Sequence, residues 1–495
     1  MSMLYLKYID SGLPVLIHAI LCILAYLVWS VAALLIGPVI CLFRTFKFFE
    51  TSLIKYKRFG TIFSTYDVPF LHETENNRNY IVGLIRVQGE PNITELRKWV
   101  LYRLFESKSE LDETYKRLSQ RIRRRYLSYV WEDEDCFNIK QHMKMFKGAT
   151  PRTEAEEQKI FENLATEDIS RNISPWLFKI IPTANKKSYL IFVKFHHTIG
   201  DGFAMVGLLS RLVDKRPEFL NFSKSTRKTN FMANPIKRAI TGIITGPLAM
   251  LVLVFSFRIK NPFRAKTPPV KKIVSWTPPI SLDLVRRIKT KTESTVNDVM
   301  MSCLAGAIRR YLSEVRQKKP QDFPIAMTFN ARSSSAKLAD TIPLGNKSGG
   351  LFLSLPVSVE NPIERLDITR ARLNKLKTLS HPHLFSFLYF SVIGGLPELI
   401  GRISTYSINR HASMIVSNVP GPTEPIFILG SPIESIVFTP PLHGDVGMAA
   451  SVFSYNKKIR VTLMSDKTIV RDLPRLTNFF TQEVQRLEEI ILLND

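Results

Sequence analysis

The heptapeptide HHTIGDG, residues 196–202, follows the apolar segment YLIFVKF at 189–195 and leads into GFAMVGLLSRLV at 202–213. An almost continuous apolar run of this length is typical of a central β-strand that is covered on both faces. The segment after the motif has apolar residues at helical spacing. The sequence therefore predicts a buried strand, a turn that carries the polar motif, and a helix.

The segments on either side of this unit alternate between strand and helix patterns. Strands are expected at 81–87 and 176–181, and a helix from about residue 93 to 105. The second half has a strong helix pattern at 296–312 and strand patterns at 349–357 and 414–419. Residues 451–490 at its end are expected to form two strands followed by a helix. Such a mixture in two halves predicts an α/β protein with a two-domain body.

Residues 13–43 form a run without Asp, Glu, Lys or Arg. About 20 apolar residues cross a bilayer, and a cleavable signal peptide has a shorter apolar core, so we expect an uncleaved membrane anchor. The alternative is a buried helical hairpin that turns at Gly37-Pro38. Five basic residues follow the run within 15 positions, which places the long C-terminal portion in the cytosol by the positive-inside rule.

A second apolar stretch, residues 239–257, has basic residues on both flanks. Both ends are therefore expected on the cytosolic side, which a single crossing cannot satisfy. We expect a re-entrant hairpin or an interfacial segment, with a buried core helix as the alternative.

The formal net charge of the 495-residue chain is +25, and 45% of its residues are hydrophobic. This composition excludes a disordered protein. A basic chain needs an anionic partner. The sequence has no zinc knuckle, helix-turn-helix or base-stacking motif, so we expect no nucleic acid as partner and favour anionic lipid headgroups.

The motif limits the chemistry that its side chains can perform. Adjacent residues of a strand point to opposite faces, so His196 and His197 cannot readily share one metal ion, and no metal site is expected. Gly200 and Gly202 permit a backbone path that larger residues resist. Asp201 is expected to pair with a cation and fix the turn, or to cap the following helix. We expect His196, Asp201 and Gly202 to have structural roles.

HHTIGDG resembles the HHxxxDG signature of the CoA-dependent acyltransferase superfamily. From about Ser64 onward the chain resembles the wax ester synthase/diacylglycerol acyltransferase family in particular. The further landmarks of this resemblance are Asp67–Leu71 with Glu73, Trp131, Phe137 and His142, Thr295–Val299, Gly345-Asn346, Leu355–Val357 with Asn361–Leu366, Ser417–Pro422, Ser454-Tyr455 and Ser465-Asp466.

The sequence departs from the pattern of this family at three places. The apolar segments 13–43 and 239–257 are not part of the bacterial pattern. The strand that usually reads Pro-Val-x-x-Arg is here MTFNAR, residues 327–332. These differences concern the choice of acceptor more than the chemistry.

The resemblance implies transfer of a fatty acyl group from acyl-CoA to the hydroxyl of a long-chain alcohol, a diacylglycerol or both, which forms wax esters or triacylglycerol. His197, the second histidine of the motif, would be the general base. Acyl-CoA would be a co-substrate, and no resident cofactor is expected. The alternative is a non-catalytic, membrane-bound protein that binds or transfers acyl lipids.

Four further residues are candidates for contact with substrate. Asn297 is the best side-chain candidate for a donor to the oxyanion, and Asp298 follows it; a local capping box with Thr295 is an equal interpretation of the same residues. Ser417 and Asn418 form a wall of the site, or belong only to a rigid turn that ends a strand.

We therefore expect an α/β, two-domain CoA-dependent acyltransferase-like fold, with mixed sheets flanked by helices and an N-terminal transmembrane helix. The site would lie in the cytosol at a membrane, with the endoplasmic reticulum as the default for lipid synthesis. The sequence indicates no oligomeric state. The expected divisions are an anchor at 1–55, an acyltransferase domain at 56–215, a basic linker at 216–275 and a second acyltransferase domain at 276–495.

Overall fold

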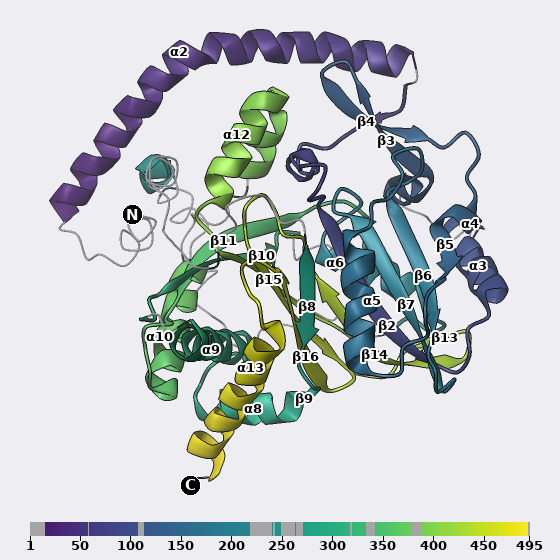
Figure 1. Cartoon of the computed structure of the whole chain (residues 1–495). Helices are drawn as coiled ribbons and strands as arrows, with labels where there is room; N and C mark the ends of the chain where they lie inside the picture. The colour runs from purple at the N-terminus through teal and green to yellow at the C-terminus, as the bar shows by residue number, and fades with distance from the viewer. Residues whose placement is uncertain are drawn as a thin grey trace.

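A computed structural model describes most of the chain, and Figure 1 shows the arrangement of its elements. The described residues are 15–57, 59–106, 113–217, 240, 243–248, 263, 271–316, 319–332, 342–378, 386 and 388–493. Of the second apolar stretch, only residues 240 and 243–248 belong to this set, so the expectation for most of 239–257 lies outside the described residues.

The first sheet has six strands and contains the predicted central strand. Its order is β13 (Phe427–Ile428), β14 (Ser431–Thr439), β2 (Tyr80–Gln88), β7 (Ser188–His196), β6 (Trp176–Pro182) and β5 (Met143–Met145). All neighbours are antiparallel except β5 and β6. β14 comes from the second half of the sequence, so the two halves share this sheet.

Strand β7 is buried on both faces, as its apolar sequence predicted. Ile191 and Phe195 pack in the cluster that includes α6 (Gly202–Leu212). Leu190 and Phe192 pack on the other face against α5 (Glu154–Thr166). α3 (Ile93–Leu101) and α4 (Ile139–His142) also belong to this half, and Asn92 caps α3 by accepting from two backbone N–H groups.

The second sheet has seven strands. They are β11 (Ser348–Leu355), β10 (Phe323–Asn330), β12 (Met414–Pro420), β15 (Met448–Tyr455), β16 (Lys458–Asp466), β8 (Lys272–Trp276) and β9 (Ile280–Ser281). One face packs against helices that include α8 (Leu282–Lys291), α9 (Val296–Arg310), α10 (Pro362–Thr378) and α13 (Leu473–Glu488).

The other face of the second sheet is turned towards the first half. Along β10, Ile325 and Met327 lie in the helical core, whereas Ala326 and Thr328 line a cavity. The same alternation places Ile415 of β12 at this cavity. Period-two geometry therefore gives this sheet one packed face and one face available to a ligand.

The N-terminal helix differs from its expected bounds. α2 runs from Val15 to Tyr56 and contains Pro38, so it does not end near residue 43. Residues 44–56 contain no Gly or Pro that would end a helix. A smaller sheet, β1 (Thr61–Ile62), β4 (Ser128–Asp133) and β3 (Gln120–Arg125), follows α2.

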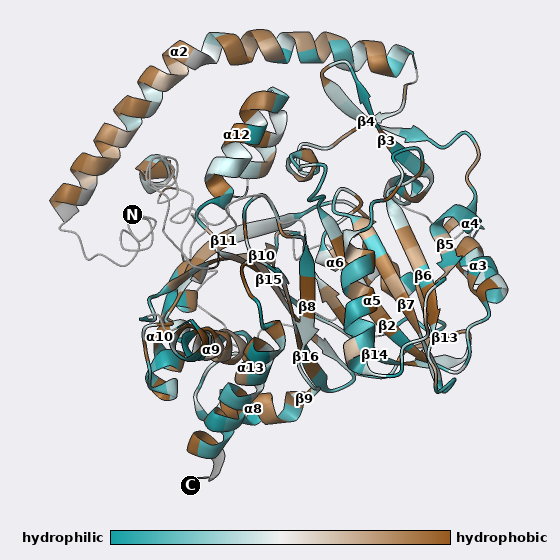
Figure 2. Ribbon diagram, viewed as in Figure 1, coloured by the Kyte–Doolittle hydropathy of each residue, from teal (hydrophilic) through white to brown (hydrophobic). Residues whose placement is uncertain are grey.

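Figure 2 shows apolar residues along much of α2. Within the described chain, no single helix is both long enough and apolar enough to cross a bilayer. The pair Ala19–Leu35 and Gly37–Tyr56 meets this requirement together by length and composition, and its two parts are bent by 53°. Proline inside a helix is an ordinary cause of such a bend.

Within the described residues, hydrogen bonds join α2 both to the segment 243–248 and to the turn between β3 and β4. The indole of Trp29 donates to the carbonyl of Pro247 at 2.9 Å, within the described part of the second apolar stretch. The buried carboxylate of Glu50 accepts from the backbone N–H groups of Leu127 and Ser128, at 2.7 and 3.0 Å, in the turn between β3 and β4.

Candidate active site

His197 lies one residue beyond the end of β7, at the start of the turn that the motif forms. Its backbone N–H donates to the carbonyl of Asn79 at 2.7 Å. Its ring stacks on the ring of Phe70, with the centroids 3.9 Å apart. The half-buried side chain lines a cavity with about 1010 Å³ of empty space, part of it open to solvent. The imidazole is therefore neither sealed in the core nor turned to bulk solvent.

Asn346 determines which ring nitrogen of His197 carries the proton. The amide NH₂ of Asn346 donates to the carboxylate of Asp67 and to the carbonyl of His197, both at 2.8 Å. Its side-chain oxygen therefore faces Nδ1 of His197, at 3.0 Å, and must accept from it. Nδ1 holds the proton, and Nε2 keeps a lone pair that can accept one.

Burial keeps this ring neutral. Desolvation lowers the pKa of His197 to about 4, although the negative charge of Asp201 acts in the opposite direction. At neutral pH the imidazole is therefore uncharged, with a proton on Nδ1 and none on Nε2, which is the form required of a general base.

Asp201 holds the turn in both of the expected ways. Its carboxylate accepts from the backbone N–H of Ala204 and so caps α6. Both carboxylate oxygens also accept from Nη1 of Arg332, at 3.0 and 2.9 Å. Burial alone would raise the pKa of this carboxyl, but Arg332 and the hydrogen bonds bring the pKa below its ordinary value. Asp201 is thus an ion-paired anchor between the motif and the segment after β10.

Gly202 begins α6 and lines the cavity beside His197. A Cβ atom there would lie 3.1 Å from a side-chain carbon of Val419, tighter than ordinary van der Waals contact. The absence of a side chain therefore allows α6 to approach β12 closely.

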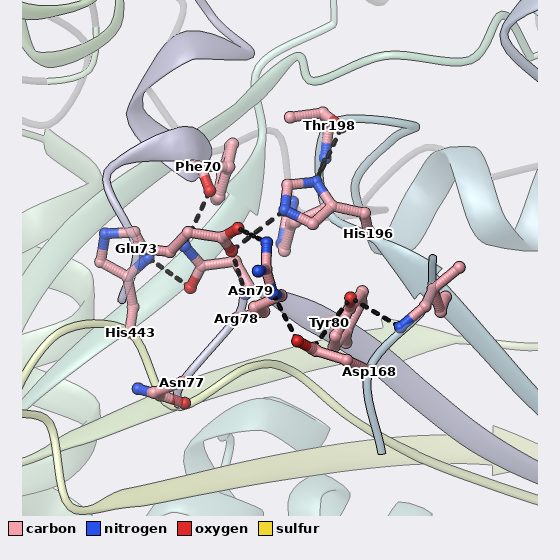
Figure 3. Close-up of polar contacts among 12 residues, drawn as sticks. Phe70, Glu73, Asn77, Arg78, Asn79, Tyr80, Asp168, His196, Thr198 and His443 are labelled. Carbon is pink, nitrogen blue, oxygen red and sulfur yellow. Dashed lines mark hydrogen bonds and ion pairs between the residues drawn. The ribbon is translucent and has the colours of Figure 1, made fainter. Parts of the chain in front are cut away.

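His196 points away from His197, as strand geometry requires. Its Nε2 lies 3.1 Å from the carboxylate of Glu73, and its Nδ1 lies 2.8 Å from the hydroxyl of Thr198. Glu73 also pairs with Arg78 and accepts from the backbone N–H of Asn79, in the network shown in Figure 3. This polar network fixes the segment that accepts the backbone N–H of His197.

The structure brings only Ser417, of the four candidates for substrate contact, to the cavity. Because successive residues of β12 face opposite sides, Asn418 points to α9, where its amide donates to Asn297 at 2.8 Å. Asp298 takes part in a capping box with Thr295. Asn297, Asp298 and Asn418 therefore lie outside the described lining of the cavity, and the local interpretation of Asp298 fits the structure.

Several residues of the site had no assigned role in the sequence. Arg332 stood in the segment that departs from the family pattern, and Asn346 and Phe70 were landmarks without a function. Their roles depend on contacts between segments that are more than 100 residues apart, such as the 149 positions between His197 and Asn346. The fixed order of these landmarks was the only available signal. His443 also lines the cavity, but nothing in the sequence marked it as a residue of the site.

A second, almost wholly apolar cavity lies between α6 and the first sheet. It has about 670 Å³ of empty space, part of it open to solvent, and its lining includes Gly83, Val193, Met205 and Leu209. Ile81, Gly202 and Phe438 line both cavities, so the two adjoin next to the motif. Among the described residues, no group of three or more His, Cys, Asp or Glu could hold a metal ion.

This architecture agrees with what comparisons with known proteins show. Residues 63–256 match the wax ester synthase/diacylglycerol acyltransferase catalytic domain, and residues 344–488 match the WS/DGAT C-terminal domain. The chain belongs to the wax ester synthase/diacylglycerol acyltransferase family. The family expected from HHTIGDG and the ordered landmarks is thereby confirmed.

Individual members and solved structures extend this finding. A putative diacylglycerol O-acyltransferase of Mycobacterium tuberculosis is 25% identical over 397 residues, which cover 73% of this chain and 76% of that protein. The wax ester synthase/diacylglycerol acyltransferase from Marinobacter aquaeolei VT8 has a TM-score of 0.62 at 16% identity and covers 87% of this chain and 99% of its own.

A more distant likeness is to the starter condensation domain of rhizomide synthetase, solved in complex with C8-CoA. Its TM-score is 0.55 at 11% identity, over 88% of this chain and 96% of that chain. The expected mixed α/β, CoA-dependent acyltransferase-like fold is confirmed.

Proposed function

We propose that this protein transfers a fatty acyl group from acyl-CoA to the hydroxyl of a long-chain alcohol, a diacylglycerol or both, with His197 as the general base. The observation that carries the proposal is the neutral imidazole whose Nδ1 proton is held by Asn346 while the ring borders a largely apolar cavity. Family membership and the oxyester named in the family description agree with this chemistry.

The reaction needs one base and no covalent enzyme intermediate. The acceptor hydroxyl donates its proton to Nε2 of His197 while its oxygen attacks the thioester carbonyl. The tetrahedral intermediate then expels the CoA thiolate, and the ester is complete. The imidazolium returns the proton to the thiolate, which leaves free CoA and a neutral histidine.

The two adjoining cavities would divide the substrates between them. The apolar cavity beside α6 has the lining that an acyl chain requires, and it meets the His197 cavity at Gly202. The acceptor lipid would enter the larger cavity between the two sheets. The positive net charge of the chain would favour approach of the CoA phosphates.

We also propose that α2 anchors the protein to a membrane, with the site on the cytosolic side and the endoplasmic reticulum as the compartment. The exposed apolar side chains along α2, Leu34 and Leu35 among them, and the basic residues that follow its apolar part support this arrangement. A tethered enzyme could take acyl-CoA from the cytosol and its acceptor from the leaflet.

The test is an assay of purified full-length protein with labelled palmitoyl-CoA and either hexadecanol or dioleoylglycerol. We expect ester formation with at least one acceptor, and a fall in kcat by a factor of about 10² to 10⁴ in His197→Ala. His142→Ala serves as the control, because His142 is buried beneath Trp176 and contacts no cavity residue named above.

Two outcomes would contradict the proposal in different ways. Full turnover in folded His197→Ala would remove His197 from the role of base. Tight binding of acyl-CoA without ester formation in the wild type would favour the non-catalytic lipid-binding alternative.

A further inference from the structure

Asp67 is completely buried and contacts the residue that fixes the proton of His197. It stands at the N-terminal end of the short 3₁₀ helix η1 (Val68–Leu71), where an aspartate ordinarily caps the helix, but its carboxylate makes no capping hydrogen bond. The carboxylate instead binds Asn346, 279 positions away. The backbone N–H and the side-chain NH₂ of Asn346 both donate to Oδ1, at 3.2 and 2.8 Å. A role in local structure therefore does not account for this side chain.

The second carboxylate oxygen of Asp67 has a different neighbour. Oδ2 lies 3.0 Å from Nη2 of Arg117, whose side chain is 13% exposed. Nη1 of the same guanidinium donates to the carbonyl of Thr198, in the turn of the motif, at 2.9 Å. The guanidinium also packs over the ring of Trp131. The carboxylate is thus fixed between a cation on one side and the N–H groups of Asn346 on the other.

The surroundings of Asp67 require an acceptor at both of its oxygens. Oδ1 faces the N–H groups of Asn346, and Oδ2 faces the guanidinium of Arg117. A side-chain amide has one acceptor and one NH₂ group, which only donates. In Asp67→Asn, either orientation of the new amide would therefore set a donor against a donor. The isosteric change tests the carboxylate without a change of volume.

The orientation of the Asn346 amide depends on these contacts. Its NH₂ group has two acceptors, the Asp67 carboxylate and the carbonyl of His197, and together they turn its oxygen towards Nδ1 of His197. Loss of the carboxylate removes one of the two groups that oppose a reversal of the amide. In the reversed amide the NH₂ group would donate to Nδ1, so the imidazole proton would lie on Nε2. That nitrogen could then take no proton from an acceptor hydroxyl.

We propose that Asp67 is a positioning residue for the transfer reaction: through Asn346 it holds the proton of His197 on Nδ1 and so keeps Nε2 free to act as the base. This inference rests on the proposed acyltransferase function. In the Ser-His-Asp triad a buried carboxylate fixes the tautomer of the basic histidine directly, whereas here an amide stands between the two. Neither Asp67 nor Asn346 belongs to the described lining of the cavity, so neither is expected to contact substrate.

The kinetic experiment compares full-length wild type, Asp67→Asn and the exchanged variant Asp67→Asn/Asn346→Asp, with palmitoyl-CoA and hexadecanol or dioleoylglycerol. Loss of the tautomer-holding carboxylate of a triad lowers kcat by about 10⁴, and here the carbonyl of His197 remains as a second acceptor, so we expect a fall of about 10² in Asp67→Asn. KM should change by less than about 3-fold, because no substrate contact is removed. The carboxylate introduced by Asn346→Asp can only accept from Nδ1, so the exchanged variant should recover kcat by about 10-fold or more.

The tautomer itself is measured by NMR of the protein with ¹⁵N-labelled histidine, because protonated and bare imidazole nitrogens resonate at different frequencies. The signals of His197 are identified by their absence in His197→Ala. We expect the proton on Nδ1 in the wild type and the exchanged variant, and a population with the proton on Nε2 in Asp67→Asn. A merely structural role of Asp67 would leave the tautomer unchanged.

The control is Glu157→Gln, which changes another buried carboxylate that is paired with an arginine, Arg86, outside the described lining of the His197 cavity. It should keep the wild-type kcat and the wild-type tautomer.

Wild-type kcat in folded Asp67→Asn would overturn the proposal, as would a fall in kcat with an unchanged tautomer of His197. Asp67→Ser, which introduces no amide and shortens the side chain, replaces Asp67→Asn with the same expectations if the latter fails to fold. A proton on Nε2 of His197 in active wild type would overturn the proposal without any variant at residue 67. Absence of ester formation in the wild type would instead refute the proposed function, and the NMR measurement, which needs no turnover, would still test Asp67.

Discussion

Replacement of Arg332 by methionine should destabilise the protein strongly. Arg332 is the cationic partner of Asp201, and the exposed fractions of their side chains are 11% and 2%. Methionine keeps the apolar stem but removes the guanidinium. The Asp201 carboxylate would then remain buried, with backbone N–H groups of Ala204 and Lys347 as its remaining donors.

The magnitude follows from the contacts that are lost. Nη1 of Arg332 contacts both oxygens of Asp201, and Nη2 donates to the carbonyl of Gly345 at 3.0 Å. Hydrogen bonds to charged groups contribute about 1.5–3 kcal/mol each, and loss of one member of a buried ion pair costs about 3–5 kcal/mol. We therefore expect the free energy of unfolding to fall by about 4 kcal/mol.

A double-mutant cycle with Asp201→Asn separates the ion pair from the loss of packing. The unfolding free energy of wild type, both single variants and the double variant would be measured by urea denaturation at pH 7.5. The double variant should be more stable than the sum of the single effects predicts, by about 2 kcal/mol or more. A loss below about 1 kcal/mol in Arg332→Met, or a coupling energy near zero, would refute this reasoning.

Three further predictions concern pH, chain length and α2. Burial lowers the pKa of His72 to about 4, and that of His443 to about 3, from an unfolded value near 6.5. The unfolded state therefore binds protons first as the pH falls. The free energy of unfolding should drop between pH 7 and 5 by about 2 kcal/mol per histidine. A midpoint of urea denaturation that stays the same over this pH range would contradict the prediction. Leu209→Trp should fill the apolar cavity and so reduce kcat/KM for palmitoyl-CoA relative to octanoyl-CoA by about 10-fold or more. Leu190→Ala, on the opposite face of the sheet, should leave this ratio unchanged. If Leu209→Trp also left the ratio unchanged, the acyl chain would have to bind elsewhere. Glu50→Ala should lower the unfolding free energy by about 2 kcal/mol and make the β3–β4 turn more sensitive to proteases. Glu50→Gln should have a smaller effect. If Glu50→Ala resisted proteolysis at this turn as well as the wild type does, α2 would have to be held by other contacts.

Local pattern was sufficient for most of the elements. The continuous apolar run before the motif is β7, because a strand that is buried on both faces is apolar at every position. The segment after the motif is α6, because a helix that is buried on one face has apolar residues every three or four positions. The same applies to α9, whose start at Val296 and capping box were both expected from the sequence.

The surroundings of His197 could not be derived in the same way. Strand geometry shows that His196 and His197 point to opposite sides, but it does not show which side borders the cavity. The position of the proton on His197 depends on Asn346, which is distant in the sequence. Asn297, in the first turn of α9, was the best side-chain candidate for a donor to the oxyanion. Its partner instead is Asn418, since the pleat of β12 turns that residue away from the cavity and Ser417 towards it.

Strand β14 has a consequence for synthesis of the chain on the ribosome. About 350 residues separate it from β2, the strand beside which it inserts. At roughly 5–20 residues per second, the backbone edge of β2 waits about 20–70 s for its neighbour. During that interval the nascent chain exposes an unpaired strand edge next to apolar side chains, and exposed strand edges promote aggregation. A gene truncated after residue 256 would make this exposure permanent, so the first half is expected to require the second for solubility.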